Sequence, residues 1–328
     1  MVDYKENEVC GLVSVIIPTY KRSDMLGRAI DSVLEQTYDK VEVIVVDDNS
    51  DGDEYRKSTS ALMQQYANNS KVHYLQHERN MNGAAARNTG IIYSRGEYIA
   101  FLDDDDYFLK TKIEKSIHFL ISADDSYGGV CTNYVKKNKS YVYKIGDSSG
   151  EYINCYQLLT KRVDYAAGST LLCKRSAIDQ IGLFDVSFVR HQDWEFLIRF
   201  FRNYKLKVLE DIGVVICTDG FRNIPNSDVM FQMKQKLLTL FSSDIEKLGM
   251  ERYKDVMHVQ WLELSGCYLK ERRYCRANEL LKRKIGLMNL KCRDYFELLY
   301  SFIVGLYPPV IRLFYYMYSK KHVMKINV

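Results

Sequence analysis

The chain has 328 residues, 47% of them hydrophobic, and a formal net charge of +4. This length and apolar content support a large α/β domain with a smaller appendage. None of the eight cysteines forms a CxxC pair, which argues against a metal-thiolate site. The first eight residues lack an apolar h-region, so we expect no signal peptide and reduced thiols in the cytosol.

Strand-like and helix-like patterns alternate from Leu12 onward. β-branched and apolar runs predict strands at 13–17, 41–46, 72–75 and 97–102, with Pro18 ending the first. Helical spacing of apolar residues predicts helices at 24–34, up to residue 65, at 83–93 and at 113–121. This order predicts an α/β fold, a mostly parallel central sheet with helices on both faces.

The pattern changes after residue 121. Further strands are expected at 127–134, 140–145 and 167–173, and a helix carries Trp194, Leu197, Ile198 and Phe201 on one face. From about Asp228 the pattern is almost wholly helical, including short helices at 262–271 and 274–284. We therefore expect one α/β domain at 11–225 and a helical C-terminal region at 226–328.

Acidic residues follow apolar segments at three places: Asp47-Asp48, the run from Asp103 to Asp106, and Asp193. Four carboxylates in a row repel one another, so a run placed where a strand leaves the sheet suggests a bound cation. Ligands bind at this edge of open α/β sheets, and carboxylate oxygens suit Mg²⁺ or Mn²⁺. The alternative for the run is a solvated acidic turn.

Two further segments belong to the same edge. Pro18-Thr19-Tyr20 offers a hydroxyl and an aromatic ring, and residues 82–88 offer small side chains and the cation of Arg87. Residues far apart in sequence can then converge in one cleft.

The whole set resembles the family 2 glycosyltransferases of the GT-A fold. The matching segments, in order over roughly residues 11 to 225, are 13–20, 45–50, 82–90, 101–106, 181–185 and 191–194. One segment alone would be a weak signal, but the complete series in order is a strong one. The resemblance implies the GT-A fold and an inverting, metal-dependent hexosyltransferase.

The resemblance also implies roles for individual residues. Pro18, Thr19, Tyr20, Asp48, Arg87, Asp103 and Asp104 would contact the nucleotide sugar, and Asp105 would ligate Mn²⁺ or Mg²⁺. Asp193 would be the general base and Trp194 an apolar wall for a sugar. Alternative interpretations are a turn cap for Asp48, a solvated helix residue for Arg87, and helix N-capping for Asp193, Asp104 or Asp106. Gln192 stands where the family commonly has an acid.

The C-terminal region suggests the acceptor. Residues 270–293 contain nine Lys or Arg and two acids, so this segment carries +7 and the rest of the chain −3. Residues 295–318 are apolar and aromatic, but Pro308-Pro309 and two charges disfavour a membrane span. We expect interfacial helices that attach the protein peripherally to the inner face of the cell membrane. A tail that docks on the protein itself is the alternative.

Together these features predict transfer of a hexose from a UDP-sugar, UDP-Glc or UDP-Gal, to a polyprenyl-diphosphate-linked saccharide in O-antigen or capsule assembly. A non-catalytic sugar-nucleotide-binding scaffold is one alternative. A nucleotidyltransferase is another, although residues 18–22 lack the glycine-rich loop that such enzymes usually carry. No motif supports nucleic-acid binding. The sequence leaves open the donor sugar, the acceptor, the linkage, the polysaccharide, the oligomeric state and the roles of Asp47 and Asp106.

Overall fold

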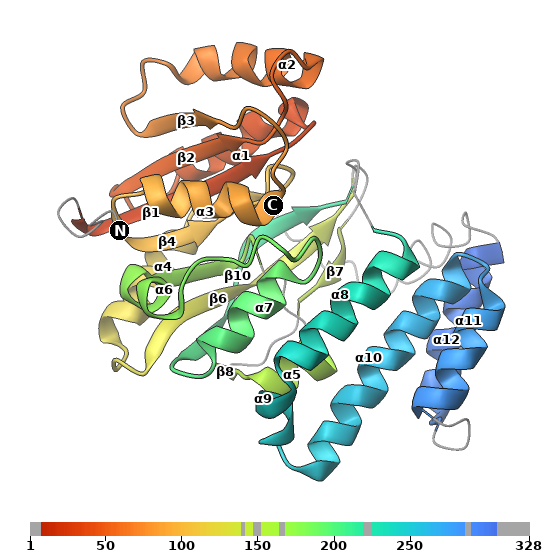
Figure 1. Cartoon of the computed structure of the whole chain (residues 1–328). Coiled ribbons are helices and arrows are strands. Elements are labelled where there is room, and N and C mark those ends of the chain that lie inside the picture. Colours follow the sequence, from red (N-terminus) through yellow and green to blue (C-terminus); the bar gives the residue numbers. More distant parts are fainter. Residues whose placement is uncertain are drawn as a thin grey trace. The chain divides into compact units, whose positions relative to one another are not determined.

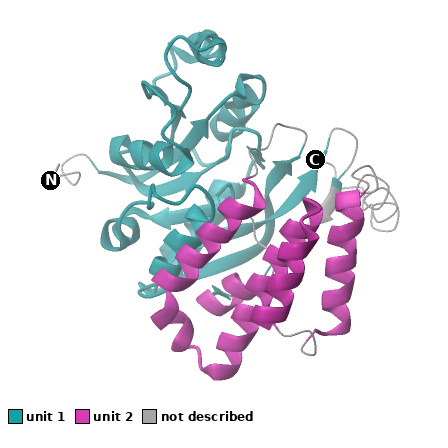
Figure 2. Cartoon of the chain, turned by 45° about the vertical axis from the view of Figure 1, so that its right-hand side comes forward, with its two compact units in different colours: residues 1–154, 163–222 teal, residues 155–162, 223–328 magenta. Residues whose placement is uncertain are grey.

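The computed structural model describes residues 8–138, 142–146, 152–163, 168–218, 225–285 and 290–306. The chain forms two compact units, one made of residues 1–154 and 163–222 and the other of residues 155–162 and 223–328 (Figure 2). The second unit therefore takes a short segment from the middle of the chain. The functional division predicted at residue 225 stays a prediction.

Unit 1 is built on one sheet, whose main path among the described residues runs β3-β2-β1-β4-β9-β6-β10-β5 (Figure 1). The strands are β1 Val9–Thr19, β2 Val41–Asp47, β3 Val72–Gln76, β4 Gly96–Phe101, β5 Tyr107–Phe108, β6 Tyr127–Lys137, β7 Val142–Ile145, β8 Tyr152–Ile153, β9 Leu171–Lys174 and β10 Lys205–Cys217. Strands β1 to β4 pair in parallel, as do β6 and β10, whereas β9 runs antiparallel between β4 and β6. This confirms the predicted α/β fold with a mostly parallel sheet.

Helices cover both faces of the sheet. On one face α1 (Ser23–Leu34) and α4 (Lys112–Ser122) share a core with Val13, Val15 and Ile17. On the other face α3 (Gly83–Tyr93) packs against β1 and β2. The approach of α3 is close, because a Cβ at Gly90 would lie 2.4 Å from Ile16 Cγ2. The remaining helices of this unit are α2 Glu54–Met63, η2 Gln64–Tyr66, α6 Arg175–Ile181 and α7 Gln192–Phe200.

One sequence prediction about strands was wrong, and one strand was missed. Pro18 does not end β1, because Pro18 pairs with Val46 and Thr19 with Asp47. Pairing of β1 with β4 stops at Ile16, so the proline lies at the margin of the ladder, where a missing N–H is tolerated. The strand β10 was not predicted, because polar residues 210 and 211 interrupt its apolar pattern. The register of β10 against β6 shifts at this point, which accommodates them.

Unit 2 is helical in the part that the structure describes. Its elements are α5 Cys155–Thr160, α8 Ser227–Leu240, α9 Ser242–Glu246, α10 Met250–Lys270, α11 Tyr274–Leu280, η3 Leu281–Ile285 and α12 Cys292–Leu306. The helix predicted at 262–271 is the last part of the much longer α10. None of the described helices is long and apolar enough to cross a membrane.

Polar bonds attach α5 to α10 within this unit. Tyr156 donates its hydroxyl to Asp255 at 2.7 Å, and Gln260 donates its amide to the Leu159 carbonyl. The fully buried Lys234 of α8 bonds Gln260 and Glu263 of α10, each at 2.6 Å. Glu263 has its pKa lowered by Lys234 and Lys161, against the effect of its burial.

Candidate active site

The carboxyl ends of β1 and β2 lie side by side. The Asp48 backbone N–H donates to the Thr19 carbonyl at 2.9 Å, and the Tyr20 N–H donates to the Asp104 carboxylate at 3.3 Å. Pro18 and Tyr20 are partly exposed, whereas Thr19 is buried. The three residues predicted to meet the nucleotide therefore border the acidic run, as the parallel register requires.

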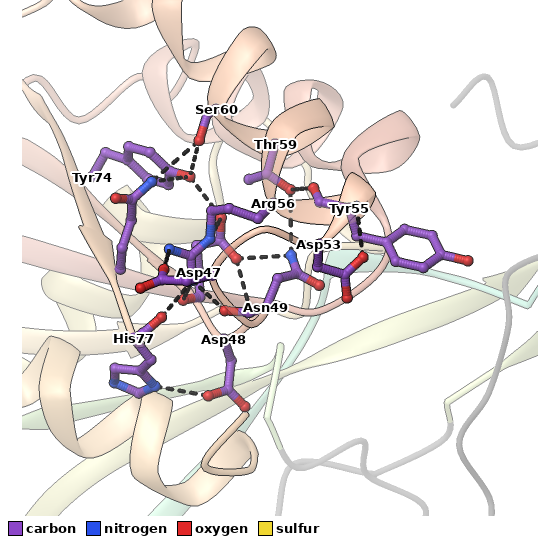
Figure 3. Close-up of polar contacts among 12 residues, drawn as sticks. Asp47, Asp48, Asn49, Asp53, Tyr55, Arg56, Thr59, Ser60, Tyr74 and His77 are labelled. Carbon is purple, nitrogen blue, oxygen red and sulfur yellow. Dashed lines mark hydrogen bonds and ion pairs between the residues drawn. The ribbon is translucent and has the colours of Figure 1, made fainter. Parts of the chain in front are cut away.

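Asp47 is bound by neighbouring side chains. It is fully buried, and its carboxylate pairs with Arg56 at 3.0 Å and accepts the Tyr74 hydroxyl at 2.6 Å (Figure 3). Asn49 donates both its backbone and its side-chain N–H to the other oxygen. Asp47 thus ties α2 and β3 to the end of β2, which is a structural role.

Asp48 accepts two hydrogen bonds on each carboxylate oxygen. One oxygen takes His77 Nδ1 at 2.7 Å and the Met81 N–H at 2.8 Å (Figure 3 shows the histidine contact). The other takes the Asn80 amide at 2.8 Å and the Asn82 N–H at 3.0 Å. Burial raises the pKa of Asp48, and these donors act in the opposite direction. A nucleotide base N–H would share an oxygen with donors that already hold the loop before α3.

Asn82 places the start of α3 in a strained conformation. Its φ of 79° and ψ of 164° lie in a region that is essentially confined to glycine. Its side chain caps α3 by accepting from the N–H groups of Ala84 and Ala85 and donates to the Val186 carbonyl at 3.0 Å. Sequence analysis did not single out this residue, although an Asn before a helical run is a known capping signal.

The acidic run folds into a compact loop after β4. One carboxylate oxygen from each of Asp103, Asp105 and Asp106 lies within 4.8 Å of the others. Burial raises the pKa of Asp104 to about 7, while Arg22 acts to lower it. Burial and the neighbouring Asp103 and Asp105 raise the pKa of Asp106 well above its ordinary value. Burial and mutual repulsion therefore make it unfavourable for all the carboxylates of this loop to be ionised at once.

Two arginines that sequence analysis missed contact this loop. Arg22 Nε lies 2.9 Å from Asp104, and its Nη1 lies 2.5 Å from Asp105. Arg28 donates to the backbone carbonyl of Asp105 at 2.6 Å and lies over the Tyr107 ring. The nearness of Arg22 to Tyr20 in sequence was the available signal.

Arg87 connects the acidic loop to α7. Its Nη2 donates to Asp103 at 2.7 Å, and its Nη1 reaches Gln192 Oε1 at 3.5 Å. Asp103 is 39% exposed at its side chain, so it has room for a further partner. The side-chain amide N–H of Gln192 also donates to the Phe188 carbonyl at 2.7 Å.

Asp193 and Trp194 lie in the first turn of α7. The preceding His191 is buried with φ 62°, a left-handed conformation that is uncommon outside glycine, and its ring lies 4.7 Å from that of Trp194. Burial raises the pKa of Asp193, and Arg190 and Arg87 act in the opposite direction. A raised pKa makes a carboxylate a stronger base, which suits the role of a general base.

The donor set fits a hard divalent cation. Three carboxylates supply oxygen ligands within 4.8 Å, and their mutual repulsion would be relieved by a dication. The predicted ligand Asp105 belongs to this group, and Asp106 is an addition to the prediction. Asp106 accepts from Ser169 Oγ at 2.6 Å and from the Cys217 N–H at 3.0 Å, which fixes its orientation.

The fold is that of the GT-A glycosyltransferases. Residues 14–182, more than half of the chain, match the model of glycosyl transferase family 2, so the chain belongs to that family. S. aureus TarS 1–349 in complex with UDP-GlcNAc has the same fold, with a TM-score of 0.57 and 18% identity, covering 82% of this chain and 88% of that one.

Two relatives are similar in sequence. The uncharacterized glycosyltransferase RP339 of Rickettsia prowazekii is 28% identical over 286 residues, covering 84% of this chain and 85% of that protein. The UDP-Glc:alpha-D-GlcNAc-diphosphoundecaprenol beta-1,3-glucosyltransferase WfaP of Escherichia coli is 30% identical over 177 residues, covering 54% of this chain and 64% of that protein. Glycosyltransferase membership is thereby confirmed, and the roles of individual residues stay predictions.

Proposed function

We propose that this chain is an inverting, metal-dependent hexosyltransferase of polysaccharide assembly. It would move a hexose from UDP-glucose or UDP-galactose to a hydroxyl of a saccharide on a polyprenyl diphosphate, in an O-antigen or capsule repeat unit. The observation that supports the proposal is the link from Asp103 through Arg87 to Gln192 at the start of α7, the residue before Asp193. The name of WfaP supports the donor and acceptor classes.

The chemistry follows from the side chains. The acceptor oxygen attacks C1 of the sugar as its proton passes to the Asp193 carboxylate, and the bond from C1 to the diphosphate oxygen breaks, releasing UDP. One displacement inverts the anomeric centre, so an α-linked donor gives a β-glycoside. Arg87 and Arg22 would bind diphosphate oxygens, and Asp103 would bind the ribose. Mn²⁺ or Mg²⁺ held by Asp105 would neutralise the charge of the leaving group.

A donor screen tests this proposal. UDP or GDP release is measured with each nucleotide sugar, Mn²⁺ or Mg²⁺ and a lipid-diphosphate-GlcNAc acceptor, with Asp193→Asn alongside. We expect acceptor-dependent release from one UDP-sugar, removed by EDTA and lowered roughly 10²- to 10⁴-fold by the substitution. Metal-dependent UDP binding without turnover with any acceptor would favour a sugar-nucleotide-binding scaffold. Release of diphosphate from a sugar phosphate and a nucleoside triphosphate would favour a nucleotidyltransferase.

We further propose peripheral attachment to the inner face of the cell membrane, which suits a lipid-linked acceptor. In α12 five apolar residues at helical spacing are 36% to 72% exposed: Tyr295, Phe296, Leu299, Phe302 and Leu306. The exposed bases at 282–284 belong to the same unit. An apolar helix face with nearby cations suits an anionic bilayer surface. Most of the predicted tail, beyond residue 306, lies outside the described residues.

Vesicle flotation tests the attachment. Phe296→Ser with Leu299→Ser should reduce flotation on anionic vesicles, whereas Ile121→Ser, which alters a 71% exposed apolar side chain of unit 1, should not. Equal flotation of all three proteins would rule out a role for this helix face.

A further inference from the structure

The side chain of Arg22 spans two neighbouring carboxylates of the acidic loop. Its Nε lies 2.9 Å from Asp104 and its Nη1 lies 2.5 Å from Asp105. The Arg22 side chain is 24% exposed and that of Asp105 10%, against 0% for Asp104, so the contact with Asp105 is the less deeply buried of the two. The Asp105 carboxylate, which would ligate the metal, is therefore already paired with the Arg22 guanidinium.

Of the two contacts, the one between Arg22 Nε and Asp104 is the more deeply buried. Asp104 is fully buried and also accepts from the Tyr20 N–H at 3.3 Å. Leaving Asp104 would strand a buried carboxylate, which costs more than leaving the partly accessible Asp105. The Nη1 end of Arg22 can thus move while the Nε end stays.

Arg28 provides an internal comparison. Like Arg22, it contacts Asp105, but its hydrogen bond goes to the backbone carbonyl of that residue. Its guanidinium lies over the Tyr107 ring, 4.9 Å from the ring centroid. It supports the backbone of the loop and does not hold the carboxylate. Between the two arginines, Arg22 is the one whose position conflicts with a metal on Asp105.

We propose that Arg22 is an exchangeable counter-cation that occupies Asp105 in the donor-free protein and transfers its Nη1 end to the donor diphosphate. This inference rests on the proposed function, since it assumes that Asp105 ligates the metal. A guanidinium pairs well with phosphate oxygens, so the diphosphate replaces the carboxylate that Arg22 gives up. Metal alone must compete with Arg22, whereas metal together with nucleotide diphosphate need not. Arg22 therefore makes the binding of metal and nucleotide cooperative.

Mn²⁺ binding to the full chain, followed by the electron paramagnetic resonance of free Mn²⁺, tests the inference without turnover. For the wild type, saturating UDP should tighten Mn²⁺ binding by about 5- to 150-fold, the usual range of such coupling. Arg22→Gln should bind Mn²⁺ alone about tenfold more tightly and lose most of the UDP effect. Arg22→Lys, which keeps the charge but not the fork, should fall between the two.

Arg28→Gln is the matched control, because it removes a nearby cation whose hydrogen bond goes to the backbone carbonyl of Asp105. It should leave the UDP effect in place. Weaker or unchanged binding of Mn²⁺ alone by folded Arg22→Gln, or an equal gain in Arg28→Gln, would overturn the inference. A wild-type protein that binds no Mn²⁺ even with UDP would instead overturn the proposed metal site, whatever Arg22 does. Thermal unfolding of each variant establishes that it is folded.

Discussion

Two acidic segments that look alike in sequence differ in how the protein treats their charge. Asp47 and Asp48 follow β2, and Asp103 to Asp106 follow β4, and both end buried strands at the same edge of the sheet. The first pair is surrounded by donors from the chain, including Arg56, Tyr74 and His77 (Figure 3). The second run keeps three carboxylates within 4.8 Å and raised pKa values at Asp104 and Asp106. A carboxylate surrounded by donors from several elements holds structure together, whereas a cluster of carboxylates that repel one another is suited to bind a cation.

The largest effect on stability should come from the satisfied segment. Asp47→Ala leaves the nearly buried Arg56 guanidinium without its buried partner, so the free energy of unfolding should fall by about 3–5 kcal/mol. Urea unfolding measures the change. Asp51→Ala is the control, because Asp51 pairs with the same arginine at 3.2 Å but is 70% exposed, and should cost at most about 1 kcal/mol. Equal losses in both variants would break the comparison.

The unsatisfied segment should respond in the opposite way. Asp105→Asn should lower kcat roughly 10²- to 10³-fold, the usual cost of losing one electrostatic contribution at a reacting centre. The melting temperature should be unchanged or higher, because one of several mutually repelling charges is gone. Initial rates and thermal unfolding are measured on the same preparation. A large loss of stability would mean that this run, like the first, is structural.

A pH-dependent effect on the free energy of unfolding should come from the buried Lys112. Among the described residues nothing accepts a hydrogen bond from Lys112, which is fully buried, and burial lowers its pKa to about 7. The folded protein then binds fewer protons at this site than the unfolded chain between about pH 7 and pH 10.4. The free energy of unfolding should therefore rise with pH across this window, by up to about 1.4 kcal/mol per unit.

Lys112→Met isolates this contribution. The variant should lack that part of the slope, so the stability difference between variant and wild type should be greatest near pH 7 and shrink toward pH 10. Denaturant unfolding at several pH values measures it. A difference that does not change with pH would mean that the lysine keeps its proton in the folded protein.

Local patterns predicted the parallel half of the sheet well. Residues 83–93 form the predicted helix, and β2 and β3 each extend one residue beyond the prediction. These elements have uninterrupted periodicity, so each local signal agrees with the fold. The strand β10 could not be found this way, because its polar centre is tolerated only through a register shift against β6. That compensation lies about 80 residues away in sequence.

The candidate site shows a similar limit. The carboxylates could be placed at the edge of the sheet, because the ends of parallel strands meet there. The partners of each carboxylate could not be predicted. The donors to Asp48 come from residues 77 to 82, and the cation paired with Asp105 is Arg22. Such pairings depend on tertiary structure, which one sequence does not reveal.

The segment 155–162 has a consequence for how this protein can be divided. Its helix α5 is bound within unit 2 through Tyr156 to Asp255 and through the Leu159 carbonyl to Gln260. No single cut therefore separates the two units: a chain ending at residue 222 would carry α5 without its partners and expose Leu158 and Leu159, which are at most 1% exposed in the complete protein. During synthesis the ribosome makes this helix long before α10. The bonds that join α5 to α10 can therefore form only after the last third of the chain has been synthesised. Domain exchange between relatives would need three junctions and the transplantation of α5 together with the C-terminal helices.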